Sequence, residues 1–350
     1  MRPFLEEHFG NASSAHAYGR IARAAIDSAR QHVARLIGAQ PSEILFTSGG
    51  TESNNHVLRE LVTRGRHLVT SAMEHPAILD VCHRLERDGA SVTRLPVDRY
   101  GRLDPDQVAA ALRPETALVS LMHANNEVGT LQPLAEIAAH LKKRQGILFH
   151  TDAAQSVGKV PVDVNTLGVD LLTIAGHKLY CPKGVGALYI RTGTPLPRFL
   201  DGAGQEQGRR AGTENVLHIA GLGAACQLLH NEPHDARPQR DQLERRLLES
   251  IPGLTLNGHP DERLPNTTSL SFPGIDAHRL LAALEPVVAA SAGAACHAGA
   301  VHLSHVLQAM GIGEEQGRGT LRFSTGRFTT AAEIDQAALA IIEAWRQHKR

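Results

Sequence analysis

Short apolar runs alternate with segments of helical periodicity along the first two-thirds of the chain. Apolar residues at spacings of three and four from Ala22 to Leu36 predict an amphipathic helix. Predicted strands follow at residues 44–46, 67–70, 91–96, 117–122 and 147–150, and predicted helices at 57–62, 77–85, 104–112 and 134–141, with the stretch TSGGTESNN taken as a turn. This alternation is typical of βα units around a mainly parallel sheet.

A polar segment with two prolines, Asn231 to Pro238, predicts a domain boundary. We expect a large domain over residues 12–232 and a smaller α+β domain over residues 233–350, with residues 1–11 packing nearby. A nearly uniform apolar helix is predicted over 213–229. The last helix has the spacing of a capping box in Thr330 and Glu333.

Composition narrows the possible partners. The 350-residue chain has a formal net charge of zero, which argues against nucleic acid or an anionic membrane as the main partner. It has no apolar run of membrane-spanning length and no apolar signal core near its first residue. The four cysteines are far apart and lack CxxC spacing, so neither disulfides nor a metal site is predicted, and we expect a cytoplasmic protein.

Lys178 lies between two apolar runs, Leu171–Ala175 and Val185–Ile190, which we predict to be paired strands. An apolar setting would lower the pKa of the lysine amine, and a neutral amine is the nucleophile that a Schiff base requires. The alternative is a solvated lysine at a hairpin. This stretch alone favours that alternative.

The stretch Ser48-Gly49-Gly50-Thr51 links a predicted strand to a predicted helix. Its glycines permit close approach of the backbone, and a helix N-terminus offers N–H groups to a phosphate. The spacing matches neither a Walker loop nor a dinucleotide fingerprint. The alternative is an ordinary capped turn, which is a strong explanation of this stretch taken alone.

Asp152 and Gln155 follow another predicted strand, at the sheet edge where parallel sheets bind ligands. Asp152 could keep a pyridinium nitrogen protonated, or it could simply cap a helix. Polar residues also follow the strands that precede residues 73–76 and 122–127. Taken with Lys178, these clusters predict a single site for pyridoxal phosphate.

Several ordered motifs resemble one family from about residue 9 to the last helix. These motifs are FGNASSAHAYGR, FTSGGTESNN, HANNEVGTLQP, HTDAAQSVGKVPVD, GHKLY followed by PKGVGALY, AGTENV and RFSTGRFTT. They resemble the cysteine desulfurases of the class V aminotransferase group, and RLPNT with ASAGAACH also resembles the related selenocysteine lyases. The resemblance implies an α/β protein of PLP-dependent transferase fold type I, with a mainly parallel seven-stranded sheet and a smaller α+β C-terminal domain.

The resemblance also implies roles for individual residues. Lys178 would bind pyridoxal phosphate, Asp152 would pair with its pyridine nitrogen, Gln155 and Asn126 would face its ring oxygen, and His75 would stack on the ring. The Gly50 backbone, Thr51 and His177 would hold the phosphate, and Thr213 would reach the phosphate of a neighbouring subunit, which implies a homodimer. Arg322, with Asn126, would bind the substrate carboxylate.

Cys296 matches the sulfur-accepting cysteine of the family. It lies in a run of small residues, Ala289–Ala300, that predicts a mobile loop. The implied reaction converts L-cysteine to L-alanine and leaves a persulfide on Cys296 for an acceptor or scaffold protein, in iron-sulfur cluster or thio-cofactor supply. Cys82 and Cys226 are interpreted as small buried hydrophobes, and the role of Cys181 stays open.

Three other functions compete with the desulfurase. The first is a selenocysteine lyase acting on L-selenocysteine. The second is a weakly active scaffold protein, since the family's opening strand and Asn-Ala-Thr-Thr-Pro turn are absent before Met1. The third is a transaminase, against which Cys296 argues because transamination needs no thiol. The chain also departs from the family pattern at Ala175, Cys181 and Gln207.

Overall fold

The computed structural model describes residues 1–285, 287–297 and 300–349, with the backbone alone described for 294–297 and 300–302. The chain forms two compact units. The first comprises Met1–Leu95, Pro105–His123 and Pro133–Pro233, and the second comprises Pro96–Asp104, Ala124–Gln132 and His234–Arg350. Throughout the part of the chain that the structure describes, no helix combines the length and apolar character needed to cross a bilayer.

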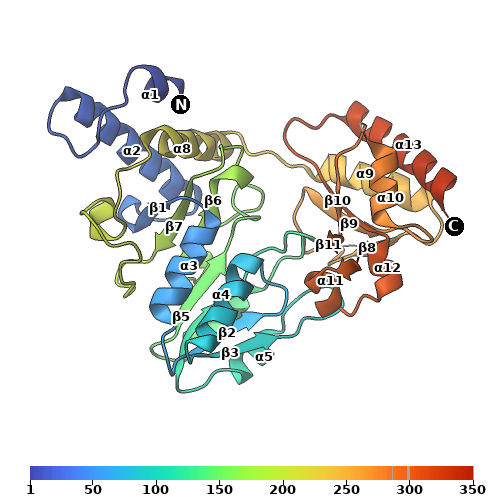
Figure 1. The fold of residues 1–350 in the computed structure, drawn as a ribbon, viewed down its shortest axis with the longest axis horizontal. Coiled ribbons are helices and arrows are strands. Elements are labelled where there is room, and N and C mark those ends of the chain that lie inside the picture. Colours follow the sequence, from blue (N-terminus) through green and yellow to red (C-terminus); the bar gives the residue numbers. More distant parts are fainter. Residues whose placement is uncertain (286, 298–299, 350) are drawn as a thin grey trace. The chain divides into compact units, whose positions relative to one another are not determined.

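A seven-stranded, mainly parallel sheet forms the centre of the first unit (Figure 1), as predicted. Its strand order is β1-β7-β6-β5-β4-β2-β3, and β7 is antiparallel to both neighbours. The strands are β1 (Ile44–Thr47), β2 (His67–Ser71), β3 (Ser91–Leu95), β4 (Thr116–Ser120), β5 (Leu148–Asp152), β6 (Leu171–Ala175) and β7 (Gly186–Ile190). The predicted pairing of the two apolar runs around Lys178 is confirmed, since β6 and β7 pair from Leu171 with Ile190 to Ala175 with Gly186.

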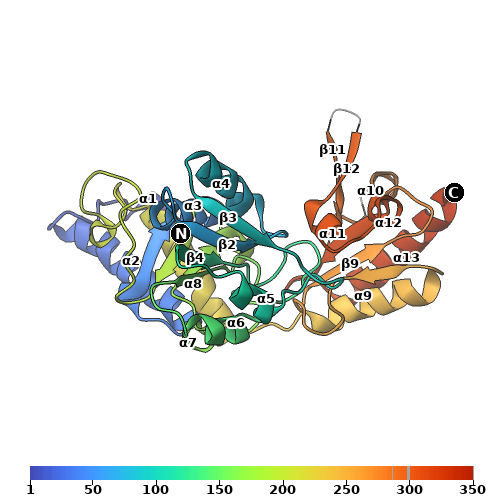
Figure 2. The ribbon, with the colours of Figure 1, turned by 90° about the horizontal axis from the view of Figure 1, so that it is seen from below.

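Helices cover both faces of this sheet, α3 and α4 on one side and α6, α7 and α8 on the other (Figure 2). The helices are α1 (Arg2–Glu6), α2 (Ala17–Leu36), α3 (Gly50–Leu61), α4 (Pro76–Arg87), α5 (Pro105–Ala110), α6 (Leu134–Leu141), α7 (Val164–Leu167) and α8 (Val216–Asn231). Helices α2 and α8 lie side by side (Figure 1), and a Cβ at Gly223 would come within 2.5 Å of the Ala29 Cα. The missing side chain at Gly223 therefore allows the two helices to pack closely.

Two buried histidines link neighbouring strands inside the sheet. The ring of His67 on β2 bonds to Thr116 and Thr93 at 2.9 Å each. The ring of His150 on β5 bonds to the hydroxyl of Ser120 at 2.8 Å and to that of Thr173 at 3.0 Å. Burial lowers the pKa of His150 to about 3, so its ring is neutral and can donate one hydrogen bond and accept another.

Several predicted boundaries differ from the structure by a few residues, and three of these differences concern predicted site residues. The predicted turn over TSGGTESNN is wrong, because α3 begins at Gly50 and the Glu52 carboxylate accepts a hydrogen bond from the Ser48 N–H at 2.8 Å. Helix α8 begins at Val216, not at Thr213, because the Asn215 side chain caps it. Strand β5 continues to Asp152, which pairs with Thr173 of β6.

A four-stranded antiparallel sheet of order β10-β13-β9-β8 organises the second unit. Its elements are β8 (Thr255–Asn257), β9 (Thr267–Ser271), β10 (Ser291–Ala292), β13 (Thr320–Ser324), α9 (Arg237–Ser250), α10 (Ala277–Leu284), α11 (His305–Ala309), α12 (Glu314–Arg318) and α13 (Ala331–His348). The predicted capping box of α13 is confirmed, with Thr330 and Glu333 bonding reciprocally. Strands β11 (Ala294–His297) and β12 (Ala300–Leu303) form a separate two-stranded ribbon (Figure 2).

A buried ion pair connects α9 to the segment before β9 in the second unit. The Arg263 guanidinium donates to both carboxylate oxygens of Glu244, at 2.7 and 2.8 Å, and Thr268 donates to the same carboxylate. Desolvation raises the pKa of Glu244, but the hydrogen bonds from Arg263 and Thr268 outweigh it and the net shift is downward. Glu244 is therefore ionised at neutral pH.

Replacing Glu244 by alanine should leave the Arg263 guanidinium buried without its bidentate acceptor. We expect a loss of about 3–5 kcal/mol in unfolding free energy, measured by urea titration. Arg246→Ala is the matched control, because Arg246 forms an exposed ion pair with Asp335 and should cost less than about 1 kcal/mol. Equal losses in the two variants would contradict this assignment.

Candidate active site

The carboxyl ends of five strands meet at one edge of the first unit. Strands β2, β4, β5 and β6 are parallel to one another, and β1 runs the same way because both β1 and β6 are antiparallel to β7. Seven predicted site residues follow or end these strands, namely Gly50, Thr51, His75, Asp152, Gln155, His177 and Lys178. Sheet topology thus gathers them at the edge where parallel sheets bind ligands.

Asp152 ends β5 with a carboxylate that is 8% exposed. Its Oδ2 accepts a hydrogen bond from the Asn54 side chain on α3 at 2.7 Å, and its Oδ1 accepts one from the Ala154 N–H at 2.9 Å. The Asn54 Oδ1 is buried and has no hydrogen-bond partner among the described residues. The carboxylate is therefore held in one orientation beside an acceptor that can still receive a hydrogen bond.

The turn between β1 and α3 requires glycine for two reasons. Gly49 has φ of 151°, a conformation that side chains disfavour, and it is the N-cap of α3. A Cβ at Gly186 of β7 would lie 2.7 Å from the Gly49 Cα, so the strand and the turn approach as closely as their backbones allow. The first N–H groups of α3 then point out of the sheet edge, an arrangement that suits an anion.

Lys178 ends a 3₁₀ turn, η2 (Gly176–Lys178), directly after β6. Its side chain is exposed. The neighbouring His177 is partly desolvated and lies near Lys178, Lys183 and His75, all of which lower its pKa. His177 is therefore a neutral hydrogen-bonding group at pH 7. His75 is exposed at the start of α4, where its Nδ1 accepts the Ala77 N–H at 3.1 Å.

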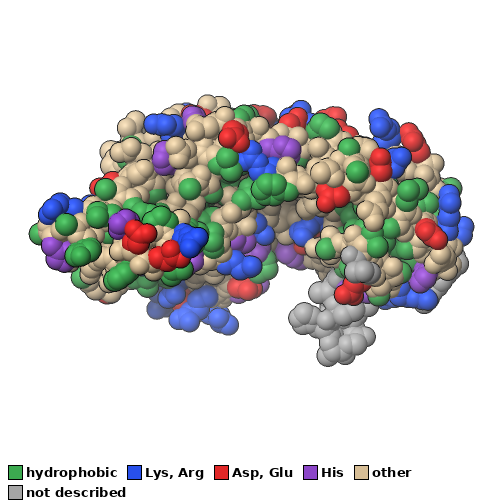
Figure 3. Space-filling model, turned by 90° about the horizontal axis from the view of Figure 1, so that it is seen from above, with side chains coloured by type: hydrophobic (Ala, Val, Ile, Leu, Met, Phe, Trp, Pro, Cys, Tyr) green, Lys and Arg blue, Asp and Glu red, His purple; other side chains and the backbone are tan. Residues whose placement is uncertain are grey.

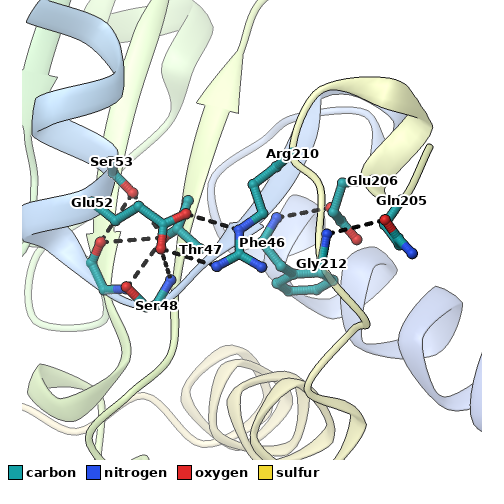
Figure 4. A network of polar contacts seen from close by, with 10 residues as sticks. Phe46, Thr47, Ser48, Glu52, Ser53, Gln205, Glu206, Arg210 and Gly212 are labelled. Atoms are coloured by element: carbon teal, nitrogen blue, oxygen red, sulfur yellow. Dashed lines mark hydrogen bonds and ion pairs between the residues drawn. The ribbon is translucent and has the colours of Figure 1, made fainter. Parts of the chain in front are cut away.

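The segment that precedes Thr213 is fixed to the β1–α3 turn by charged contacts (Figure 4). Arg210 donates to both oxygens of Glu52, at 2.9 and 3.2 Å, and the same carboxylate accepts the Ser48 N–H. Desolvation raises the pKa of Glu52, but these hydrogen bonds outweigh it and the net shift is downward. The segment and the turn therefore hold each other in place at neutral pH.

A second set of contacts fixes the same segment farther along. Glu206 forms a buried ion pair with Arg30 of α2 at 2.6 Å. Figure 4 shows that Glu206 also accepts the Phe46 N–H, at 2.9 Å, and that Gln205 accepts the Gly212 N–H, at 3.0 Å. Tyr180, Glu206 and Gln207 have positive φ, the only non-glycine residues in the described part of the chain that do. Strained conformations of this kind persist where surrounding contacts determine them, and they gather at functional sites.

Asn126 and Arg322 belong to the second unit and contact each other there. Arg322 of β13 donates one hydrogen bond to the Asn126 carbonyl and one to the Ser291 hydroxyl, at 2.8 Å each. Its buried Nε has no partner among the residues that the structure describes. The loop that carries Asn126 is held in this unit by hydrogen bonds from Leu131 to Glu262 and from Leu264 to Gly129. The two hydrogen bonds of Arg322 thus keep its guanidinium in a fixed orientation.

The cysteines differ in what their surroundings permit. Burial raises the pKa of Cys181 to about 11, and that of Cys82 and of Cys226 to about 12. Thiols with such values are poor nucleophiles at neutral pH, which argues against Cys181 as a sulfur acceptor. The backbone of Cys296 lies on β11, within the stretch predicted as a loop, and its side chain is outside the described residues, as is that of His297.

Sequence reasoning missed Asn54, Glu74 and His123, which support Asp152 and its strand. The His123 N–H donates to the Asp152 carbonyl at 2.9 Å, and Glu74 lies close enough to affect Asp152 electrostatically. Asn54 and His123 stand inside two motifs that resemble the family, FTSGGTESNN and HANNEVGTLQP, and Glu74 belongs to the polar cluster over residues 73–76. A polar residue inside such a motif, or directly after a predicted strand, was the available signal.

Comparisons with known proteins place this arrangement in a family. The model of the family described as Aminotransferase class-V matches residues 1–337. The chain belongs to the class-V aminotransferase family. It is 46% identical over 344 residues to "Cysteine desulfurase IscS" of Dictyoglomus turgidum, covering 96% of this chain and 87% of that protein. It is 45% identical over 345 residues to "Cysteine desulfurase NifS" of Azotobacter vinelandii, with coverages of 96% and 86%.

Solved structures agree with this membership of the class-V aminotransferase family. A structure titled "NIFS-LIKE PROTEIN" superposes with a TM-score of 0.91 at 35% identity, covering 98% of this chain and 93% of the other. A second, "SspA in complex with cysteine", superposes with a TM-score of 0.84 at 37% identity, covering 94% of each chain. The predicted fold class is confirmed by these neighbours.

Glu52→Ala should release the segment over residues 205–213 from the β1–α3 turn. Loss of the Arg210 contact should speed amide hydrogen exchange in that segment by roughly 10- to 150-fold, since a charged hydrogen bond contributes about 1.5–3 kcal/mol. Glu60→Ala, on the same helix, is the control and should leave exchange unchanged. Unaltered exchange in Glu52→Ala would show that Arg30 and Glu206 hold the segment alone.

Proposed function

We propose that this chain is a pyridoxal-phosphate-dependent cysteine desulfurase. It takes sulfur from L-cysteine, releases L-alanine and retains the sulfur as a persulfide on Cys296. The observation that carries the proposal is the set of groups at one sheet edge, Asp152, the start of α3 and Lys178, in a chain 45–46% identical to proteins named cysteine desulfurase. The reported relatives bear that name, which favours cysteine over selenocysteine as the substrate.

The residues of the first unit fit pyridoxal phosphate in their chemistry. The α3 N-terminus, with the Gly50 backbone, Thr51 and the neutral His177, supplies hydrogen-bond donors for a phosphate. Asp152 supplies a fixed, nearly buried carboxylate for a pyridinium nitrogen. The buried Asn54 Oδ1 without a partner is consistent with a polar group missing from this region. His75 would face the ring, and Gln155 would face its oxygen.

Bound at these residues, pyridoxal phosphate supplies an electron sink for the bond changes at the substrate. Lys178 would hold the cofactor through its Nζ and would then move the proton at the substrate Cα. Asp152 would hold the proton on the pyridine nitrogen from a site of low exposure. These roles require an accessible lysine and a rigid carboxylate, and here Lys178 is exposed while Asp152 is fixed by two hydrogen bonds.

Arg322 is the proposed binder of the substrate carboxylate. Its two terminal nitrogens are already oriented by Asn126 and Ser291, so little side-chain freedom remains to be lost when a ligand binds. The buried Nε contributes one donor toward the carboxylate. Asn126 acts through its backbone carbonyl in positioning this arginine.

Cys296 is the proposed sulfur acceptor. Its Sγ, as a thiolate, attacks the sulfur of the substrate, a new S–S bond forms, and the Cβ–S bond of the substrate breaks. The released electron pair is taken up at Cβ with a proton, which gives alanine. The other three cysteines have raised pKa values that disfavour this attack. The persulfide would then pass to an acceptor or scaffold protein.

A homodimer would complete the site, with Thr213 of one chain at the phosphate of the other. Thr213 is exposed, while the segment before it is held rigidly by Arg210 and Glu206. Large hydrophobic side chains are also exposed on the first unit, including Leu5 at 66%, Phe9 at 78% and Tyr18 at 65%. Figure 3 shows hydrophobic side chains gathered on its left-hand part, which the first unit forms. Such surfaces are typical of contacts between chains.

The three cysteines whose side chains the structure describes are free thiols, which fits the reducing environment of a cytoplasm.

Asp152→Asn should retain the cofactor but lose turnover by about two to three orders of magnitude, because a neutral amide cannot stabilise the protonated pyridine nitrogen. Alanine release from L-cysteine and the absorption of bound cofactor measure the two effects. Glu86→Gln, on the exposed surface of α4, is the control for a lost carboxylate. Turnover close to that of the wild type would remove Asp152 from the mechanism.

Cys296→Ser should bind cofactor and L-cysteine normally but form no persulfide, because a hydroxyl cannot accept the sulfur. Mass spectrometry of the wild type after addition of L-cysteine should show one added sulfur on the peptide that contains Cys296. Cys181→Ser is the matched control and should keep its activity, since that thiol is buried. Added sulfur on Cys181 instead would overturn the assignment.

A further inference from the structure

Glu74 is a fully buried acid that the proposed chemistry does not use. It follows β2 and directly precedes His75, and it is 0% exposed. Its Oε1 accepts two hydrogen bonds at 2.8 Å each, from the Ser71 hydroxyl at the end of β2 and from the Met122 N–H just beyond β4. One carboxyl oxygen therefore joins the ends of two neighbouring strands.

The contacts of Glu74 lead directly to Asp152. Met122 is followed by His123, whose N–H donates to the Asp152 carbonyl at 2.9 Å, and whose ring bonds to Ser156 at 2.9 Å. The ends of β2, β4 and β5 are thus connected in order through Glu74 and residues 122–123. Removing the Glu74 carboxyl would leave the buried Met122 N–H without this acceptor.

Two acids lie near each other at this edge, and the surroundings of Glu74 favour its protonated form. Desolvation raises the pKa of Glu74 to about 8, hydrogen bonds from Met122 and Ser71 oppose the rise, and Asp152 adds to it. The titratable groups that act on Glu74 come from β5, with Asp152, and from α4, with Cys82. Since Oε1 is occupied as an acceptor, we assign the proton to Oε2.

We propose that Glu74 is a positioning residue that carries a proton at neutral pH, joins the ends of β2 and β4, and so orients His75 and Asp152 without adding a second negative charge beside Asp152. The inference deepens the proposed function, on which its catalytic meaning rests. An uncharged acid suits this place, because two ionised carboxylates close together in a buried site would repel each other. A second ionised carboxylate would also compete with the pyridine nitrogen of the cofactor for its proton.

The protonation state can be tested on the protein without cofactor. The infrared difference between wild type and Glu74→Gln at pH 6 should contain the carbonyl-stretch band of a protonated carboxyl group, and the band should fade as pH rises through about 8. Glu86→Gln, an exposed acid on α4, should remove no such band. Absence of the band from the wild type at pH 6 would overturn the proposal.

Stability gives a second readout with a definite sign. The folded state binds the Glu74 proton more tightly than the unfolded state, whose pKa is near 4.5, so unfolding free energy should decline as pH rises from about 4.5 to about 8. In Glu74→Gln the unfolding free energy should not show this contribution to the decline between about pH 4.5 and 8. In Glu86→Gln the decline should be the same as in the wild type. An unchanged pH profile in Glu74→Gln would contradict a protonated Glu74.

Positioning is tested by affinity for pyridoxal phosphate. Glu74→Gln keeps an uncharged acceptor and should bind the cofactor as the wild type does, whereas Glu74→Ala should bind it about tenfold more weakly because Asp152 and His75 lose their support. Should Glu74→Ala fail to fold, Ser71→Ala replaces it and should shift the infrared band and weaken cofactor binding. Equal damage in the glutamine and alanine variants, or none in either, would overturn the proposal.

These measurements separate the inference from the function on which it rests. The infrared band and the pH profile need neither cofactor nor substrate. The wild type could show the infrared band and the pH profile and yet release no alanine from L-cysteine. That result would support a protonated Glu74 and refute the desulfurase proposal.

Discussion

Polar groups taken out of water must keep hydrogen bonds, and this constraint governs the first unit. Its sheet is covered by helices on both faces, yet it contains His67 and His150, each bonded to hydroxyls on two adjacent strands. These bonds exist in one strand register only, because a shift by one residue turns each ring to the other face. The same register sets Asp152 opposite Thr173 and brings it to Asn54.

The proposed site at the carboxyl edge combines rigidly held groups with an exposed amine. Gly49 and Gly186 bring two backbones into close contact, and the ion pairs of Glu52 with Arg210 and of Glu206 with Arg30 fix the segment that precedes Thr213. Lys178 is exposed at the end of a short turn. A fixed carboxylate and a helix terminus together with an exposed amine suit the proposed site, which would first hold a cofactor and then transfer a proton.

Burial also lowers the reactivity of three of the four thiols. A thiol in an apolar interior holds its proton, because the thiolate has lost its water without gaining a cation. Cys82, Cys181 and Cys226 are in this condition, and each is buried with a raised pKa. The family resemblance and the state of the other three thiols thus favour Cys296 independently as the group that takes the sulfur.

The sequence by itself determined the alternation of strands and helices, the capping box at Thr330, the buried face that carries Cys82, and the motifs that resemble the family. These depend on periodicity and on contacts between residues a few positions apart. Only the tertiary structure decided that α3 begins at Gly50, that Lys178 is exposed and that Asn54 and Glu74 lie beside Asp152. Asn54 is separated from Asp152 by 98 positions and Glu74 from Met122 by 48, so no local pattern contains either contact. Such neighbours are set by the order and register of the strands, which depend on the packing of the whole sheet.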